Sequence, residues 1–161
     1  MDIPEEPSEG NARVELWFGD RVDPSGIGSS LVVHRDIPAT RAIATSTLRA
    51  WIDGPTAEEE AVGALPSAPD GTELLGIDVD EGTAVVDLSS EFERTGAGTT
   101  YEGTILDQLA GTITQFETVD RALLKIDGES KPDYMGHGFI VDEQHPLVRP
   151  AEERYRTARR C

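Results

Sequence analysis

The acidic run Asp78-Val79-Asp80-Glu81-Gly82 has residue types that could bind a metal ion. A calcium-binding EF-hand loop needs acidic residues at positions 1, 3 and 5, a glycine at position 6 and a glutamate at position 12. Here the glycine falls at position 5, and position 12 is Ser89. An alternating strand explains the two aspartates better, since Asp78 and Asp80 would both point outward. We therefore predict no metal site in this run.

A second set with suitable chemistry lies near the C-terminus, where His137 and His145 flank Asp142 and Glu143. Imidazole and carboxylate groups are ligands that zinc accepts when three or four of them converge. A polar loop without fixed geometry explains the same residues, and we favour that interpretation. We expect no metal and no cofactor.

Residues that could support nucleophilic catalysis are isolated from one another. Ser89 and Ser90 have no histidine near them in the sequence, and Cys161 is the last residue. The chain has no Gly-x-Ser-x-Gly elbow, no Gly-x-Gly-x-x-Gly and no Walker loop. Gly96-Ala97-Gly98 could offer amides to an anion, but the surrounding charge is adverse. We predict that the protein is not an enzyme and has no catalytic residues.

Two aromatic residues are candidates for an interaction surface, namely Trp17 and Tyr101. Trp17 alternates with the inward residues Leu16 and Phe18, so it faces the other side of its strand. An exposed tryptophan there could contact a protein partner or a sugar ring. The alternative is that a second layer or the C-terminal segment covers it.

Composition limits the kinds of partner. The 161 residues include 31 acids and 14 lysines or arginines, which gives a net charge of −17. This charge argues against nucleic acid and against an anionic membrane surface. No apolar stretch approaches the roughly 20 residues of a membrane-spanning helix. One cysteine excludes an internal disulfide.

Apolar periodicity predicts an α+β two-layer sandwich of order β-β-α-β-β-α-β(-β), with two helices packed on one face of a mostly antiparallel sheet. Strands are expected over residues 13–18, 31–37, 75–80, 83–88 and 122–126, with an edge strand over 139–141 left open. Helices are expected over residues 38–53 and 99–116, with a short helical turn at residues 58–60 and an exposed helix over 149–160 left open. Gly103 and Gly111 weaken the second long helix, which indicates strong packing or the close approach of another element.

Four ordered segments resemble the GerMN domain of bacterial sporulation and spore germination proteins. The segments are Val14-Glu15-Leu16-Trp17-Phe18; Arg35-Asp36-Ile37-Pro38-Ala39-Thr40 with the later Asp53-Gly54-Pro55-Thr56; Pro69-Asp70-Gly71-Thr72 with the later Val86-Asp87-Leu88-Ser89; and Thr112-Ile113-Thr114-Gln115-Phe116 with the later Ile126-Asp127-Gly128. They suggest three parts: a disordered acidic leader (1–11), a GerMN-like domain (12–148) and a basic C-terminal tail (149–161).

The resemblance implies a non-enzymatic interaction or scaffold domain of the bacterial cell envelope, often part of a lipoprotein. Such a domain would act in the assembly of an envelope or sporulation-type complex. The implied location is extracytoplasmic, with membrane contact only through a lipid anchor that this sequence lacks. The expected partner is an envelope protein, and self-association is left open. The alternative is a peptidoglycan- or glycan-binding module, with Trp17 and Tyr101 as stacking residues.

Overall fold

The computed structural model describes residues 10–21, 29–94, 99–135 and 138–158. Its α+β class and the predicted order of the main elements are confirmed. The strands are β1 (Asn11–Asp20), β2 (Ser30–Pro38), β3 (Ala64–Leu65), β4 (Leu74–Asp80), β5 (Thr83–Leu88), β6 (Arg121–Ile126) and β7 (Tyr155–Thr157). The α-helices are α1 (Ile43–Asp53), α2 (Ala57–Ala61) and α3 (Thr99–Ile113), and the 3-10 helices are η1 (Ser90–Glu93) and η2 (Glu152–Arg154).

The strands are divided between two sheets, where the sequence predicted a single one. Sheet A has the order β3-β1-β2-β7, and sheet B has the order β4-β5-β6. β1 and β2 are antiparallel, as are β4 and β5, but β6 runs parallel to β5. The parallel pair arises because α3 carries the chain back to the start of the sheet before β6 begins, as a crossover connection requires.

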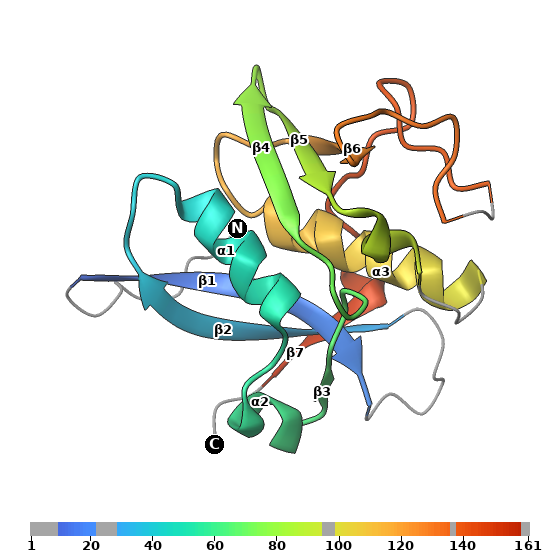
Figure 1. Ribbon diagram of the computed structural model, residues 1–161. Coiled ribbons are helices and arrows are strands. Elements are labelled where there is room, and N and C mark those ends of the chain that lie inside the picture. Colours follow the sequence, from blue (N-terminus) through green and yellow to red (C-terminus); the bar gives the residue numbers. More distant parts are fainter. Residues whose placement is uncertain (1–9, 22–28, 95–98, 136–137, 159–161) are drawn as a thin grey trace.

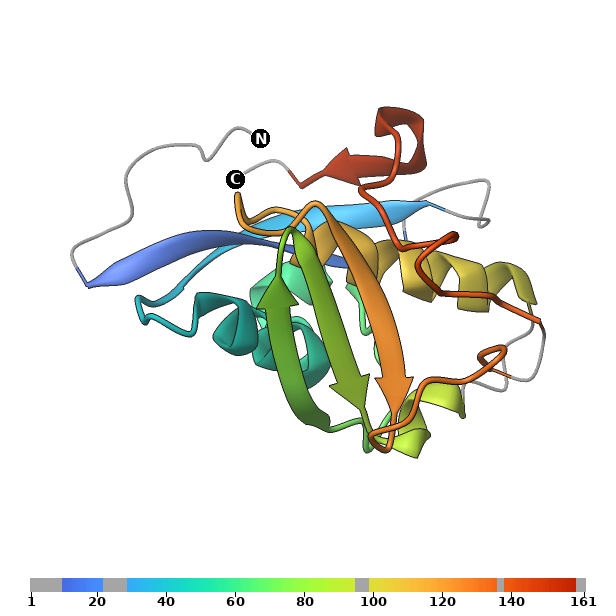
Figure 2. The same ribbon diagram turned by 90° about the horizontal axis from the view of Figure 1, so that it is seen from above.

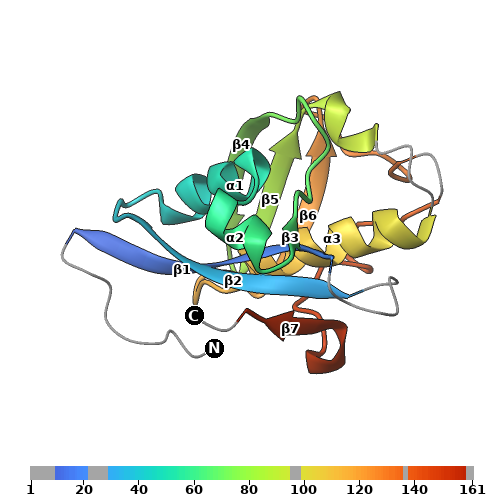
Figure 3. The same ribbon diagram turned by 90° about the horizontal axis from the view of Figure 1, so that it is seen from below.

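The two long helices join the two sheets. α1 and α3 contact each other and β1, while α1 also contacts β4 and α3 also contacts β6 (Figure 1). Their apolar faces and the inner faces of both sheets form one core. Large side chains in it include Leu16 and Phe18 from β1, Trp51 from α1 and Leu109 from α3, all fully buried. Seen from below, β1 and β2 lie on the near side of the helices (Figure 3).

Local sequence signals account for the start and end of several elements. Gly54 ends α1 with a φ of 93°, as the glycine-proline pair predicts. Thr56 and Glu59 form a capping box at the start of α2, which confirms the short helical turn. Pro38 ends β2 and does not open α1, which begins at Ile43.

Neither the edge strand over residues 139–141 nor the helix over residues 149–160, both left open from the sequence, is found in the described residues. Residues 139–141 form no strand, and only one bridge joins Phe139 to Tyr134. The predicted helix over 149–160 does not form in the described residues of that range, where η2 is followed by β7. β7 is extended because it pairs in parallel with β2. No helix in the described part of the chain has the length and apolar character needed to span a membrane.

Candidate interaction surface

Trp17 is not on the surface. Its side chain is 0% exposed, so the expectation of an exposed contact residue is corrected. The Tyr155 ring lies 4.3 Å from the Trp17 ring between centroids, and the Arg149 guanidinium lies 5.3 Å from the ring centroid. From the other direction α3 approaches so closely that a Cβ at Gly111 would overlap the indole ring. The close approach expected at Gly111 is therefore confirmed, and the covering alternative for Trp17 is the correct one.

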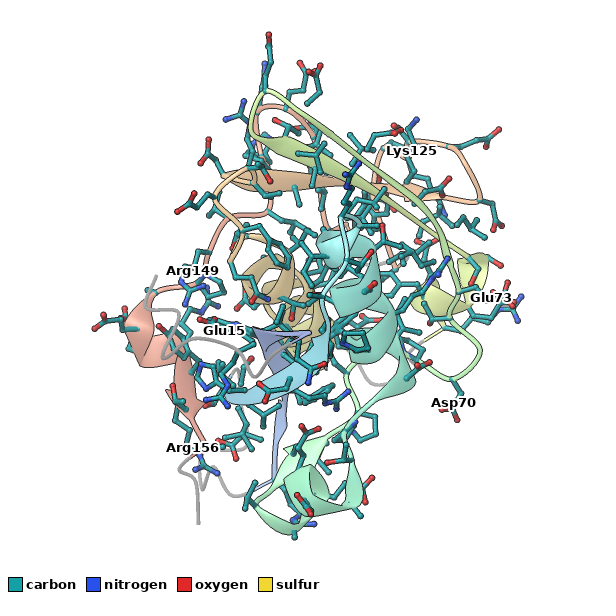
Figure 4. The ribbon with its side chains drawn as sticks, turned by 90° about the vertical axis from the view of Figure 1, so that its left-hand side faces the viewer. Glu15, Asp70, Glu73, Lys125, Arg149 and Arg156 are labelled. Atoms are coloured by element: carbon teal, nitrogen blue, oxygen red, sulfur yellow. The ribbon has the colours of Figure 1, made fainter. Side chains whose placement is uncertain are left out.

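The cover over Trp17 is the arginine strap, defined here as residues 149–158. Each of three strap arginines meets an acidic side chain of the domain: Arg149 Nη2 lies 3.2 Å from Glu15 Oε1, Arg154 Nε lies 3.3 Å from Asp107 Oδ2, and Arg156 Nε lies 2.6 Å from Asp20 Oδ2. Figure 4 shows Glu15, Arg149 and Arg156 on one flank of the molecule.

Those carboxylates are largely withdrawn from water. The Asp20 side chain is 0% exposed and the Glu15 side chain 9% exposed. Glu15 also accepts a hydrogen bond from Trp17 Nε1 at 3.1 Å. Burial raises the pKa of Asp107, and the Arg154 charge opposes that shift. A buried carboxylate without a partner is costly, so the strap stabilises the acids that it covers.

Side chains of α1, of α3 and of the turn after α3 close the free side of β1. The Gln115 side chain accepts a hydrogen bond from the Glu15 N–H at 2.8 Å and donates one to the Glu15 carbonyl at 2.7 Å. Thr112 Oγ1 accepts from the Trp17 N–H at 3.1 Å, and Trp51 Nε1 donates to the Trp17 carbonyl at 2.7 Å. The Gln115 amide thus takes the place that a peptide group of a neighbouring strand would occupy.

Other strand edges are also covered, at least in part. β7 covers β2 for three residues, from Ser30 to Val32. Ala122 of β6 exchanges two main-chain hydrogen bonds with Leu147, at 2.8 and 2.9 Å. Natural sheets protect their edges in these ways because an unpaired edge accepts strands from other chains.

β4 differs from these strands. It is seven residues long, and no other described strand pairs with its outer side. Glu81 and Gly82 have φ values of 48° and 81°, which fits the two-residue turn of a tight hairpin. In such a hairpin Asp80 and Asp78 make the hydrogen-bonded pairs with β5, so the main-chain groups of Ile77 and Val79 point to the open side.

The side chains of β4 are also exposed. Leu75 is 49% exposed and Val79 is 42% exposed, and they are two of the four most exposed large apolar side chains among the described residues. Asp78 and Asp80 are exposed as well. The β4–β5 hairpin projects beyond the helices (Figure 1), and no helix covers the face of sheet B that is turned to the viewer in Figure 2. We call the open side of β4, over residues 75–80, the β4 edge.

The remaining residues singled out from the sequence do not come together. His145 Nδ1 lies 3.0 Å from Asp142 Oδ1, and this contact lowers the pKa of Asp142. Both side chains are more than half exposed, and the described residues contain no group of three or more metal-ligand side chains. His137 and Gly96-Ala97-Gly98 lie outside the described residues, as does the side chain of Tyr101, whose main chain is in α3.

Sequence reasoning assigned the alternation within β4 but did not identify the strand as an edge. The predicted inward set of Leu75, Ile77 and Val79 is wrong at Leu75, because the register shifts between Leu74 and Gly76 and Leu74 takes the inward position opposite Leu88. Asp78 and Asp80 were a usable signal, because inward or neighbouring charges are common on strands that lie at sheet edges.

The mixed α+β arrangement of two sheets joined by helices is shared with solved structures of GerMN domains. The first GerMN domain of the sporulation protein GerM from Bacillus subtilis is similar over 86% of this chain and 98% of that one, with a TM-score of 0.65 and 23% identity. The tandem GerMN domains of GerM give a TM-score of 0.68 at 22% identity; this chain is covered over 86% of its length and spans only 46% of that two-domain chain. A candidate lipoprotein from Clostridium perfringens gives a TM-score of 0.57 at 22% identity, covering 90% of this chain and 92% of that one.

Residues 17–132 match the model of the Germane family, described as sporulation and spore germination. The chain therefore belongs to the Germane family, and the resemblance to GerMN domains is confirmed. Among curated proteins, none matches the chain. Most of the segment after β6, including the arginine strap, lies beyond the residues that the family model matches.

Proposed function

We propose that this protein is a non-enzymatic scaffold domain of the bacterial cell envelope that binds another protein by strand addition at the β4 edge. The observation that carries the proposal is the open side of β4, beside exposed Leu75 and Val79. An extended segment that pairs with such an edge gains main-chain hydrogen bonds, and the alternate side chains supply specificity.

Family membership supports the biological setting. Related structures include the sporulation protein GerM and a candidate lipoprotein. We infer an extracytoplasmic location and a role in the assembly of an envelope or sporulation-type complex. Membrane attachment would be through a lipid anchor.

The glycan-binding alternative has lost one of its two stacking residues, since Trp17 is covered by the arginine strap. It remains an outcome that the experiment can detect.

The test compares two variants at one residue. Val79→Pro removes a main-chain N–H that faces the open side, a place where sheets tolerate proline. Val79→Ala keeps the N–H and removes the two side-chain methyl groups, so it tests the side chain separately. Each protein is immobilised and exposed to solubilised envelopes, and captured proteins are identified by mass spectrometry.

We expect the wild type and Val79→Ala to capture the same protein and Val79→Pro to lose it. Equal capture by Val79→Pro, with its circular dichroism unchanged, would contradict binding at the β4 edge. Recovery of wall fragments alone would favour the glycan-binding module.

A further inference from the structure

We infer that the segment that joins the β4 edge is basic and amphipathic, with lysine or arginine at alternate positions and apolar residues between them. The inference rests on the proposed function and specifies the chemistry of its partner. It follows from the row of charges that each strand presents to its neighbour.

A strand added beside β4 lies about 4.8 Å away, and its side chains alternate between the two faces of sheet B. On the outer face they stand next to Asp78 and Asp80, with Cβ atoms roughly 5 Å apart for directly opposed residues. On the other face they stand next to Ile77 and Val79, which share that face with Leu74 because the register shifts at Leu75.

The two aspartates of β4 have no charged residue opposite them on β5. On β5 the residues opposite Asp78 and Asp80 are Val85 and Thr83, which are uncharged. The residue opposite Thr83 on β6 is Arg121, which therefore stands two strands away from Asp80, with about 10 Å between the two strands.

Other charged groups near the hairpin do not neutralise the negative charge of Asp78 and Asp80. At the tip, Glu81 adds a further negative charge, and Asp120 packs against Gly82. The neighbouring helix α1 carries one exposed cation, Arg49, and one exposed anion, Asp53. The open side of β4 is thus a strongly acidic row.

The acids on the other strands each have a base either opposite them on the neighbouring strand or as an ion-pair partner. Asp36 of β2 faces Arg13 of β1, with Arg13 Nε 2.9 Å from Asp36 Oδ1, and Asp87 of β5 faces Lys125 of β6. Asp20 and Glu15 of β1 lie opposite Ala64 and His34, and each instead forms an ion pair with an arginine of the strap. No base lies opposite Asp78 or Asp80 on a described strand, so a basic strand would complete the pattern.

The chemistry of the partner follows from both faces together. Opposite charges directly across a strand pair are favourable, and like charges are unfavourable. An acidic strand would be repelled, and a uniformly basic one would leave the apolar face of Ile77 and Val79 without apolar contacts. Alternation of basic and apolar residues satisfies both faces of the added strand.

The probes are three end-capped octapeptides: one alternates lysine and valine, one has the same composition with the lysines and valines in separate blocks, and one alternates glutamate and valine. Binding to the full chain is measured by fluorescence anisotropy at low and high salt. Amide hydrogen exchange of Ile77 and Val79 reports whether the peptide pairs with β4.

We expect the alternating lysine peptide to bind most tightly and to slow exchange at Ile77 and Val79. The double variant Asp78→Asn/Asp80→Asn should weaken that binding by roughly 2- to 30-fold, the range that two cross-strand charge pairs supply. The control Glu152→Gln/Glu153→Gln makes the same change in net charge on η2 and should leave binding nearly unchanged. High salt should reduce the difference between the wild type and the double asparagine variant.

The outcomes separate the inference from the proposed function. Equal binding of the block and alternating peptides, or of the wild type and the double asparagine variant, would overturn the inference. If Val79→Pro still abolishes capture of the envelope protein in that case, the proposed function stands. Concentration-dependent self-association that Val79→Pro removes would identify a second copy as the occupant and would also overturn the inference.

Discussion

The Gln115 side chain should contribute more to stability than its polar character indicates, because it replaces a strand beside β1. Gln115→Ala would leave the N–H and the carbonyl of Glu15 buried without partners. These hydrogen bonds are 2.8 and 2.7 Å long in the structure. Each orphaned buried group costs about 1–3 kcal/mol, so the two together should lower the free energy of unfolding by about 2–6 kcal/mol. That is a large part of the roughly 5–15 kcal/mol that holds a typical domain folded.

Urea unfolding, followed by tryptophan fluorescence, measures this loss by linear extrapolation. Two controls separate its causes. Gln115→Met fills a similar volume without hydrogen bonding, and Thr114→Ala removes only the local bond from Thr114 Oγ1 to the Ala110 carbonyl. We expect Gln115→Met to be almost as unstable as Gln115→Ala, and Thr114→Ala to lose about 1 kcal/mol or less. The reasoning is refuted if Gln115→Met matches the wild type, or if Gln115→Ala matches Thr114→Ala.

Three further predictions concern the surroundings of Trp17 and the buried acids. Gly111→Ala should destabilise the fold by about 1–3 kcal/mol despite the better helix propensity of alanine, because the new Cβ overlaps the indole ring; a thermal melt that rises would contradict this. Arg149→Met should cost about 3–5 kcal/mol in urea unfolding by leaving Glu15 with a buried charge, and adding Glu15→Gln should recover part of that loss. Asp107→Asn should be more stable than the wild type at pH 7, because burial raises the pKa of the carboxyl and the folded state then binds its proton more tightly than the unfolded state. That advantage should shrink as the pH falls through the raised pKa of the folded state and be gone below about 4, and a constant advantage from pH 3 to pH 7 would refute the assignment.

Much of the secondary structure could be predicted because its signals are local. The β4–β5 hairpin follows from period-two alternation on both sides of Glu81-Gly82, and the end of α1 follows from Gly54. The extended state of β7 was not predictable in this way. Its conformation depends on pairing with Ser30–Val32, more than 120 residues earlier in the chain.

The candidate site was predicted only in part. Sequence alternation correctly placed Trp17 on the face of its strand opposite Leu16 and Phe18, but it could not show that Tyr155 and Arg149 cover that face. The alternation correctly assigned Asp78 and Asp80 to the outward face of β4. It could not show that β4 is an edge strand, where these acids would stand beside an added strand.

The sequence by itself determined the α+β class, the order of the main elements and the negative charge, because each depends on composition or on neighbours within a few residues. Only the tertiary structure decided which strand edges are closed. Gln115 closes β1 from 100 residues away, and the arginine strap covers Trp17 from the far end of the chain. Contacts at such separations leave no periodic trace in the sequence, since they depend on how whole elements pack. The open edge of β4 is therefore a property of the folded chain.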